Sequence, residues 1–107
     1  MIRTVDLVVA GDGAAARAAA VDALQLGRRV LVVLRYGDAR AGRRLRRYLC
    51  NTAGAVVSQL GVMTRSEVVC VDGVDAVEAV IVRHARTGRL WAVNASAFVS
   101  FDGSSQS

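Results

Sequence analysis

The first third of the chain alternates between strand-like and helix-like hydrophobic patterns. Val5–Ala10 and Arg29–Leu34 are mainly apolar runs of strand length, as expected for central parallel strands covered on both faces. Between them, residues 14–26 repeat apolar positions at helical spacing, and Gly27 is well placed to end that helix. Because such a crossover is right-handed by default, these elements predict one parallel βαβ unit.

The expected helix has an apolar stripe and a polar side. The stripe consists of Ala16, Ala20, Val21 and Leu24, whereas Arg17 and Asp22 lie away from it. We therefore expect Arg17 to project from the polar side and to touch neither a bound phosphate nor the core.

The rest of the chain predicts a second helix followed by strands. Apolar residues recur at steps of three and four from Ala39 to about Gln59, which indicates a helix broken near Gly54. Gly61–Thr64 would form a third strand. From residue 67 to 93, three β-rich runs separated by "DG" and "TG" predict an antiparallel meander, and the run 97–101 would return to the parallel sheet.

These elements define an α/β fold class: a Rossmann-like βαβαβ parallel sheet with an antiparallel three-stranded β-meander before the last parallel strand. The length of 107 residues is that of one domain, which we expect to span residues 1–103, with a polar tail over 104–107. No apolar run is long enough to span a bilayer, so we expect no membrane contact. The chain opens with no signal-peptide pattern, and we expect a cytoplasmic protein.

The junction between the first strand and the first helix carries a phosphate-binding pattern. Gly11, Asp12, Gly13, Ala14, Ala15 and Ala16 fit G-x-G-x-x-A in the strand-to-helix context that this motif requires. Gly11 would allow the tight turn, Gly13 would let a pyrophosphate approach the backbone, and Ala16 would allow close packing of helix and strand. The free N–H groups of the helix would then hold the pyrophosphate. The alternative is a packing turn that has lost its ligand site.

The end of the second strand discriminates between nucleotides. Sites for NAD and FAD of this type place Asp or Glu there, where it binds ribose hydroxyls. In this chain that position is Leu34, followed by Arg35 and, five residues later, Arg40. Arginine pairs with a 2′-phosphate through its planar fork. The pattern therefore favours NADP(H) over NAD(H) and FAD.

At this point the chain resembles the NADPH-binding domain of thioredoxin-reductase-like flavoproteins, within the pyridine nucleotide–disulfide oxidoreductases. The resemblance covers residues 5–103, through the glycine motif, "VLVVLRYGDARAG", "TRSEVVCVDGVDAVEAVIVRHARTGRLWAV" and "AFVSFDG". It implies that Arg35 and Arg40 match the basic segment that grips the 2′-phosphate. Leu34 and Tyr36 stand where the family has histidine or further arginine, and Ala14-Ala15 replaces its usual Asp-Ser pair.

The resemblance also implies what this chain needs from elsewhere. Family members reduce a disulfide through FAD, with a separate FAD domain and, in many, a Cys-x-x-Cys; this chain contains neither. We therefore expect no catalytic residues here, and FAD only through a partner domain or chain. The favoured function is an NADP(H)-binding domain or subunit of a flavin-dependent oxidoreductase. The end at Ser107 matches the point where a family member returns to its FAD domain. The alternative is a stand-alone nucleotide-binding or degenerate Rossmann interaction module without chemistry. The expected partner is a flavin-binding domain or subunit, or further copies of this chain as a homo-oligomer.

The charge of the chain is carried by arginine. Fourteen arginines and no lysine, against nine acids, give a net charge of +5. Arg40, Arg43, Arg44, Arg46 and Arg47 cluster in the second helix. A solvated basic face is the favoured interpretation of this cluster, a 2′-phosphate site through Arg40 and Arg43 comes next, and nucleic acid is the least favoured because no recognition motif accompanies it.

The remaining reactive residues carry no functional pattern. Cys50 and Cys70 lack the spacing of a redox pair or zinc site, and we expect both to be inert and largely buried. His84 has no ligand set around it and is expected at the surface or on an edge strand. We expect no metal site.

Overall fold

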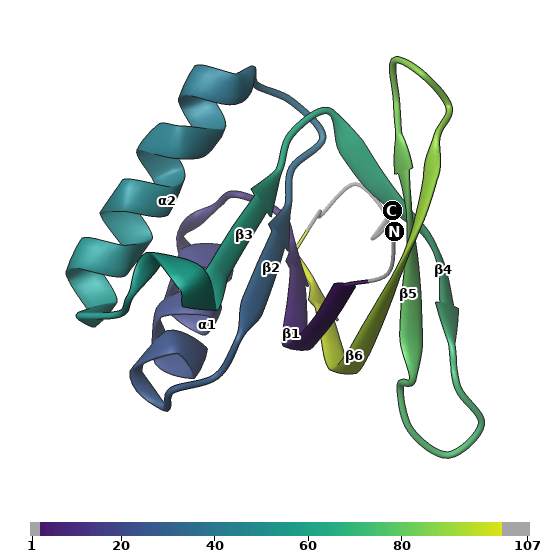
Figure 1. Cartoon of the computed structure of the whole chain (residues 1–107), viewed down its shortest axis with the longest axis horizontal. Helices are drawn as coiled ribbons and strands as arrows, with labels where there is room; N and C mark the ends of the chain where they lie inside the picture. The colour runs from purple at the N-terminus through teal and green to yellow at the C-terminus, as the bar shows by residue number, and fades with distance from the viewer. Residues whose placement is uncertain (1–2, 102–107) are drawn as a thin grey trace.

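In the computed structural model, which describes residues 3–101, two helices cover one face of a six-stranded sheet (Figure 1). The elements in chain order are β1 (Arg3–Ala10), α1 (Ala14–Gln25), β2 (Val30–Val33), α2 (Ala39–Ala53), a 3-10 turn η1 (Val57–Gln59), β3 (Leu60–Met63), β4 (Ser66–Asp72), β5 (Ala79–His84) and β6 (Leu90–Ser100). The strand order is β3-β2-β1-β6-β5-β4. The Rossmann-like α/β fold class is confirmed.

Strand β6 joins the parallel and antiparallel halves of the sheet. It pairs in parallel with β1 from Val93 to Ser100 and antiparallel with β5 from Leu90 to Asn94. The third meander strand and the returning strand, which we expected as separate elements, are therefore one continuous strand. The reason is that residues 94–96 alternate exposed and buried positions as a strand does, so the polar Asn94 and Ser96 mark a solvent face and no turn.

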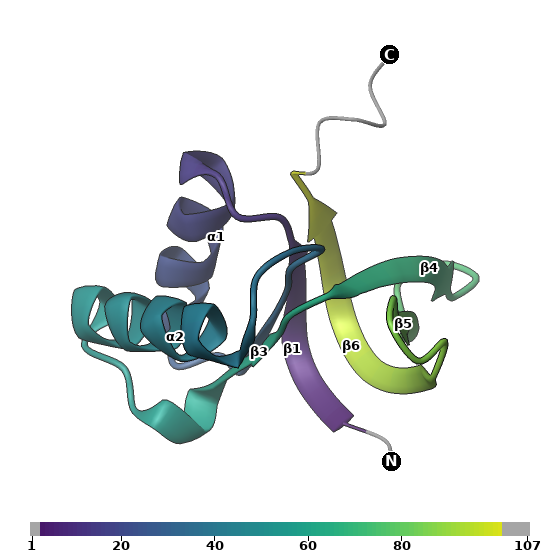
Figure 2. The same ribbon diagram turned by 90° about the horizontal axis from the view of Figure 1, so that it is seen from above.

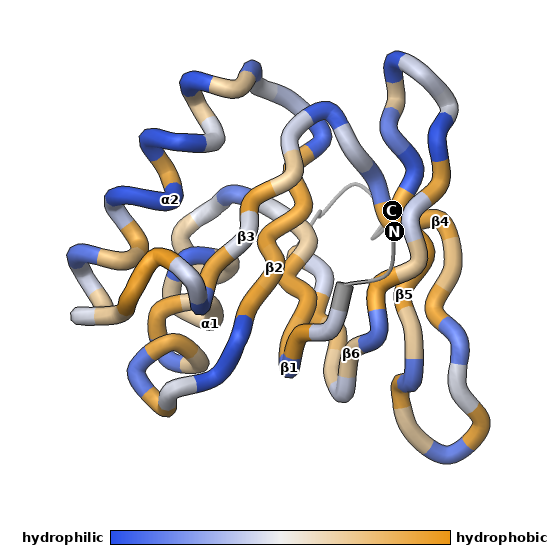
Figure 3. Tube along the Cα trace, in the orientation of Figure 1, coloured by the Kyte–Doolittle hydropathy of each residue, from blue (hydrophilic) through white to orange (hydrophobic). Residues whose placement is uncertain are grey.

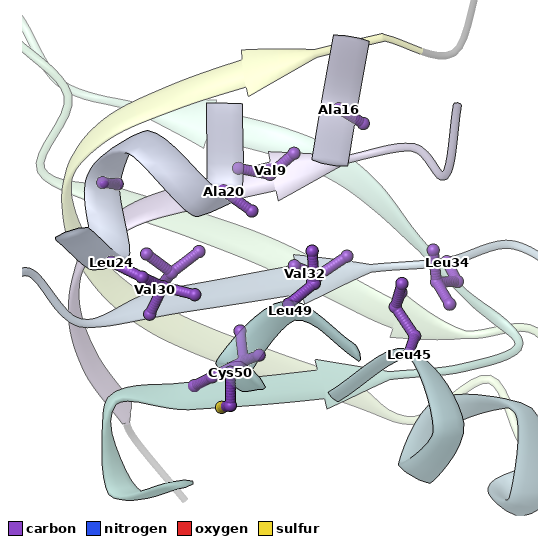
Figure 4. Close-up of a cluster of buried hydrophobic side chains, with 12 residues drawn as sticks. Val9, Ala16, Ala20, Leu24, Val30, Val32, Leu34, Leu45, Leu49 and Cys50 are labelled. Carbon is purple, nitrogen blue, oxygen red and sulfur yellow. The ribbon is translucent and has the colours of Figure 1, made fainter. Parts of the chain in front are cut away.

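The helix-covered face of the sheet holds the larger part of the core (Figure 4). Val9, Val30 and Val32 point from β1 and β2 toward the helices, where Ala20 of α1 and Leu49 of α2 meet them. All five side chains are buried. Figure 3 shows this contrast along the chain: β1 and β2 consist mainly of hydrophobic residues, whereas many residues of α2 are hydrophilic.

The opposite face of the sheet is covered by its own meander. Seen from above, β4 and β5 lie on the side of β1 and β2 away from the helices (Figure 2). Val80 and Val82 of β5 form a second buried cluster with Val8, Leu31 and Val33 of the parallel strands. This arrangement explains why β2 is buried over all four of its residues.

Both helices end where glycine predicted an end. α1 stops before Gly27, which has a φ of 77°, and α2 stops before Gly54, which has a φ of 68°. Glycine adopts these left-handed angles without the strain of a Cβ. The expected break of the second helix is thus a full stop, and Val57–Gln59 form a separate 3-10 turn.

Helix α2 begins with a carboxylate cap that makes its stability dependent on pH. The Asp38 carboxylate accepts a hydrogen bond from the Ala41 backbone N–H at 2.9 Å, which lowers the pKa of Asp38 below its ordinary 3.8. A lowered folded-state pKa gives stability that is present above the unfolded pKa and is lost as the pH falls through the folded value. We expect Asp38→Ala to lower the thermal midpoint at pH 7 and to differ less from the parent at pH 3. Asp38→Asn, which keeps a cap but does not titrate, is the control; equal pH profiles for parent and Asp38→Ala would contradict the assignment.

The expected polar tail over residues 104–107 lies outside the described residues. Within residues 3–101, neither helix combines the length and the apolar character needed to cross a bilayer.

Candidate functional site

The candidate site begins at the turn between β1 and α1. Gly11 has a φ of 127°, a backbone angle that side-chain-bearing residues rarely adopt, and its N–H donates to the Val33 carbonyl at 3.1 Å. The turn is thereby anchored to the adjoining strand. Gly11 has the conformation that the predicted tight turn requires.

Gly13 is the N-cap residue of α1, and its conformation does not itself require glycine. Its φ is −72° and its ψ is −179°, which is extended backbone open to any residue, and a Cβ built there meets nothing within 4 Å. No side chain caps the helix at this end, whereas Asp38 caps α2. The first N–H groups of an α-helix have no intrahelical partner, so α1 presents free donors beside an open space.

The three alanines after Gly13 fall into two groups. Ala14 and Ala15 are exposed at the start of α1, while Ala16 is 2% exposed and belongs to the cluster that contains Val9 of β1. The close helix–strand packing predicted for Ala16 is what the structure has. Whether Ala14 and Ala15 bind a phosphate stays a prediction.

A cleft of about 440 Å³ lies between this turn, the end of β2 and the start of α2. Its lining consists of Gly11, Asp12, Arg17, Leu34, Arg35, Tyr36, Gly37, Ala41, Arg44, Leu45 and Tyr48. The carboxyl ends of parallel strands, beyond which this cleft opens, are where ligands bind in open α/β sheets. The structure therefore brings the glycine turn and Arg35 together, as expected.

Positive charge dominates the cleft. Arg17, Arg35 and Arg44 line it, and Asp12 is the one acid among the lining residues. The charge of Arg35 also reaches Glu67 on β4. The pKa of Glu67 is lowered chiefly by its hydrogen bond and ion pair with Arg83, and to a smaller extent by the charge of Arg35. Guanidinium groups suit phosphate and carboxylate oxygens, so the cleft favours an anionic ligand.

Arg17 takes a place that the sequence pattern did not reveal. It is exposed on α1 as expected, but its Nη2 lies 3.2 Å from Asp12 Oδ1 and its Nε donates to the Asp12 backbone carbonyl at 3.1 Å. Its guanidinium also lies over the Tyr48 ring, with Cζ 5.5 Å from the centroid. Arg17 nevertheless lines the cleft, and whether it touches a bound phosphate stays a prediction.

Leu34 stands where we expected NAD and FAD sites to have an acid. It is 6% exposed and packs in the same core cluster as Leu45. Its backbone N–H donates to Met63 and its carbonyl accepts from Ser66, so the segment is tied to β3 and β4. No carboxylate is available at this position to bind a ribose.

Arg40 lies outside the lining of this cleft. It borders a neighbouring depression with Arg43, Arg44 and Arg47, and Arg44 reaches both hollows. Arg44, four residues after Arg40 on the same helix, lines the cleft together with Gly11 and Asp12 of the turn. The role predicted for Arg40 in holding a 2′-phosphate stays a prediction.

The remaining reactive residues lie elsewhere. Cys50 is buried as expected, but Cys70 is exposed on β4, so the expectation of burial was wrong there; its hydrogen bond to Asp72 raises the pKa of its thiol. His84 ends β5, and its Nδ1 accepts from the backbone N–H groups of Arg86 and Thr87. Within residues 3–101, no three His, Cys, Asp or Glu side chains gather as a metal site would require.

Several solved structures share this fold, and thioredoxin reductases are among them. Thioredoxin reductase from Streptococcus pyogenes superposes with a TM-score of 0.68 at 25% identity over 95% of this chain and 32% of that one. The Giardia duodenalis thioredoxin reductase gives a TM-score of 0.69 at 20% identity over 92% of this chain and 31% of that one. The rebeccamycin biosynthetic enzyme RebC, solved with reduced flavin, superposes with a TM-score of 0.68 at 16% identity over 98% of this chain and 34% of that one.

The chain spans about a third of the length of these enzymes, and it is similar to one portion of each. No protein-family model matches the sequence. No curated protein matches it either. The likeness thus shows that this chain has the fold of one portion of each of these enzymes.

Proposed function

We propose that the chain is an NADP(H)-binding domain or subunit of a flavin-dependent oxidoreductase. The single observation that carries the proposal is Gly13. Neither the backbone angles of Gly13 nor the packing around it requires glycine. A ligand that approaches the backbone closely at this position would require it. The uncapped start of α1 supplies the N–H donors and the positive end of the helix dipole that a diphosphate needs.

The chain's own residues would bind and orient the nucleotide. The turn 11–16 would hold the diphosphate, and Arg35 would pair with the 2′-phosphate at the end of β2. Bound NADPH supplies a hydride, and a flavin on a partner domain or subunit would accept it. The similarity to thioredoxin reductases supports this division of labour, since this chain corresponds to about a third of each of them.

FAD is the second candidate ligand. One similar structure was solved with reduced flavin, and another, the halogenase CndH, is described as FAD-dependent. The end of β2 argues for NADP(H), because Leu34 is buried where a ribose-binding acid would stand and Arg35 follows it. Binding measurements decide between the two.

Nucleotide preference is the direct test. Calorimetric titration should rank NADPH above NADH and FAD, and Arg35→Ala should remove most of the preference for NADPH over NADH. A hydrogen bond between charged groups contributes about 1.5–3 kcal/mol, which corresponds to a preference of about ten- to 150-fold.

Three further titrations complete the experiment. Arg44→Ala should weaken NADPH more than Arg40→Ala, because Arg44 lines the cleft and Arg40 does not. Arg28→Ala, at the opposite end of α1, removes one positive charge away from the cleft and should change nothing. Equal binding of NADPH and NADH would contradict the assignment of Arg35, and tighter binding of FAD would favour the second candidate.

A further inference from the structure

Asp12 is an unfavourable neighbour for the ligand proposed above. Its side chain is 64% exposed, and it belongs to the turn that leads into the uncapped start of α1. A carboxylate near a helix N-terminus is attracted by the helix dipole and repels a phosphate. Unless something holds it aside, Asp12 competes with a diphosphate for the same N–H donors.

Arg17 grips Asp12 at two points. Nη2 lies 3.2 Å from the carboxylate and Nε donates to the backbone carbonyl at 3.1 Å. The side chain of Asp12 is thereby paired with a cation that belongs to the first turns of the same helix.

Tyr48 of α2 completes the arrangement. Its ring lies against the Arg17 guanidinium at 5.5 Å, which favours a single place for that group at the contact between the helices. Arg17 and Tyr48 both line the cleft described above, and both also line a second hollow that runs along α1. The grip on Asp12 therefore stands at the rim of the cleft.

We propose that Arg17 is a positioning residue of the nucleotide site: it holds and neutralises Asp12, so that a diphosphate gains access to the N–H groups of α1. The inference rests on the function proposed above and adds a determinant outside the glycine motif. Arg17 acts through Asp12, so the effect of losing Arg17 should depend on whether Asp12 is present.

A double-mutant cycle tests this dependence. Binding of NADPH is measured by calorimetry for the parent, Arg17→Ala, Asp12→Ala and the double variant. Two unit charges about 4 Å apart in water interact by about 1 kcal/mol, so Arg17→Ala should weaken NADPH binding about fivefold. Asp12→Ala should bind at least as tightly as the parent, and the double variant should regain most of the loss.

A second probe separates positioning from a general effect on the fold. 2′-AMP carries the 2′-phosphate but has no phosphate at the glycine turn, so its affinity should be the same in the parent and in Arg17→Ala. Arg28→Ala serves as the control for loss of one positive charge, and thermal midpoints are measured for every variant.

Each outcome has one meaning. A loss of NADPH affinity that Asp12→Ala restores, with 2′-AMP binding unchanged, supports the proposal. If the parent and Arg17→Ala bind NADPH equally well, the positioning role alone is overturned. The same follows if Arg17→Ala loses affinity and Asp12→Ala does not restore it. A parent that binds neither probe overturns the proposed function and this inference with it.

Discussion

Gly13→Val should abolish NADPH binding while the thermal midpoint stays close to that of the parent. A valine side chain would occupy the open space beside the first N–H groups of α1, where the diphosphate has to approach. Each charge-assisted hydrogen bond lost there contributes about 1.5–3 kcal/mol, so loss of even one weakens binding about ten- to 150-fold. The backbone tolerates the change because φ is −72° and nothing lies within 4 Å of the new Cβ. Valine is a poorer N-cap residue than glycine, which costs up to about 1 kcal/mol of stability.

The measurement pairs calorimetric affinity with the thermal midpoint on the same variant. Gly13→Ala gives an intermediate step in side-chain size, and Gln25→Val places the same branched residue at the far end of α1 as a control. Undiminished NADPH affinity in Gly13→Val would remove the turn from the site. A collapse of the midpoint would contradict the geometry described for Gly13.

The pattern of hydrophobic residues predicted the fold because strands and helices place their hydrophobic residues at different spacings. β1 and β2 are apolar runs that end at glycine or at charge, and the alanine stripe of α1 faces them. The segment 90–100 was harder to interpret, because Asn94 and Ser96 look like turn residues in a sequence. Their exposure alternates along one strand, which only the pairing of β6 with both β1 and β5 makes visible.

The part of the candidate site that is local in sequence was predictable. The turn 11–16 and Arg35 are local features of strand ends, so their positions follow from the βαβ order. Arg17, Arg44 and Tyr48 reach the cleft from two helices that pack side by side, and their approach depends on how α1 and α2 are rotated. The spacing of four between Arg40, Arg44 and Tyr48 marks one face of α2, but the pattern alone does not show that this face borders the turn.

The packing of α2 also predicts a large loss of stability from a single substitution. Leu49 is fully buried between α2 and the strands, within the core cluster that includes Val30, Val32 and Leu60. Leu49→Ala should lower the free energy of unfolding by about 2–5 kcal/mol, because the side chain leaves a cavity that its neighbours fill only in part. For a domain of this size each kcal/mol corresponds to about 4–8 °C in the thermal midpoint, so a fall of about 10 °C or more is expected.

Two further variants make the test specific to this contact. Leu49→Met keeps nearly the same volume and should cost less than about 1.5 kcal/mol. Asn51→Ala removes an exposed side chain from the same helix and should change the midpoint little. If Leu49→Ala melts within a degree or two of Asn51→Ala, Leu49 does not dock α2 on the sheet. Because α2 also carries Arg44 and Tyr48, a true loss of that docking should weaken NADPH binding as well, whereas a variant that only loosens β4 and β5 should not.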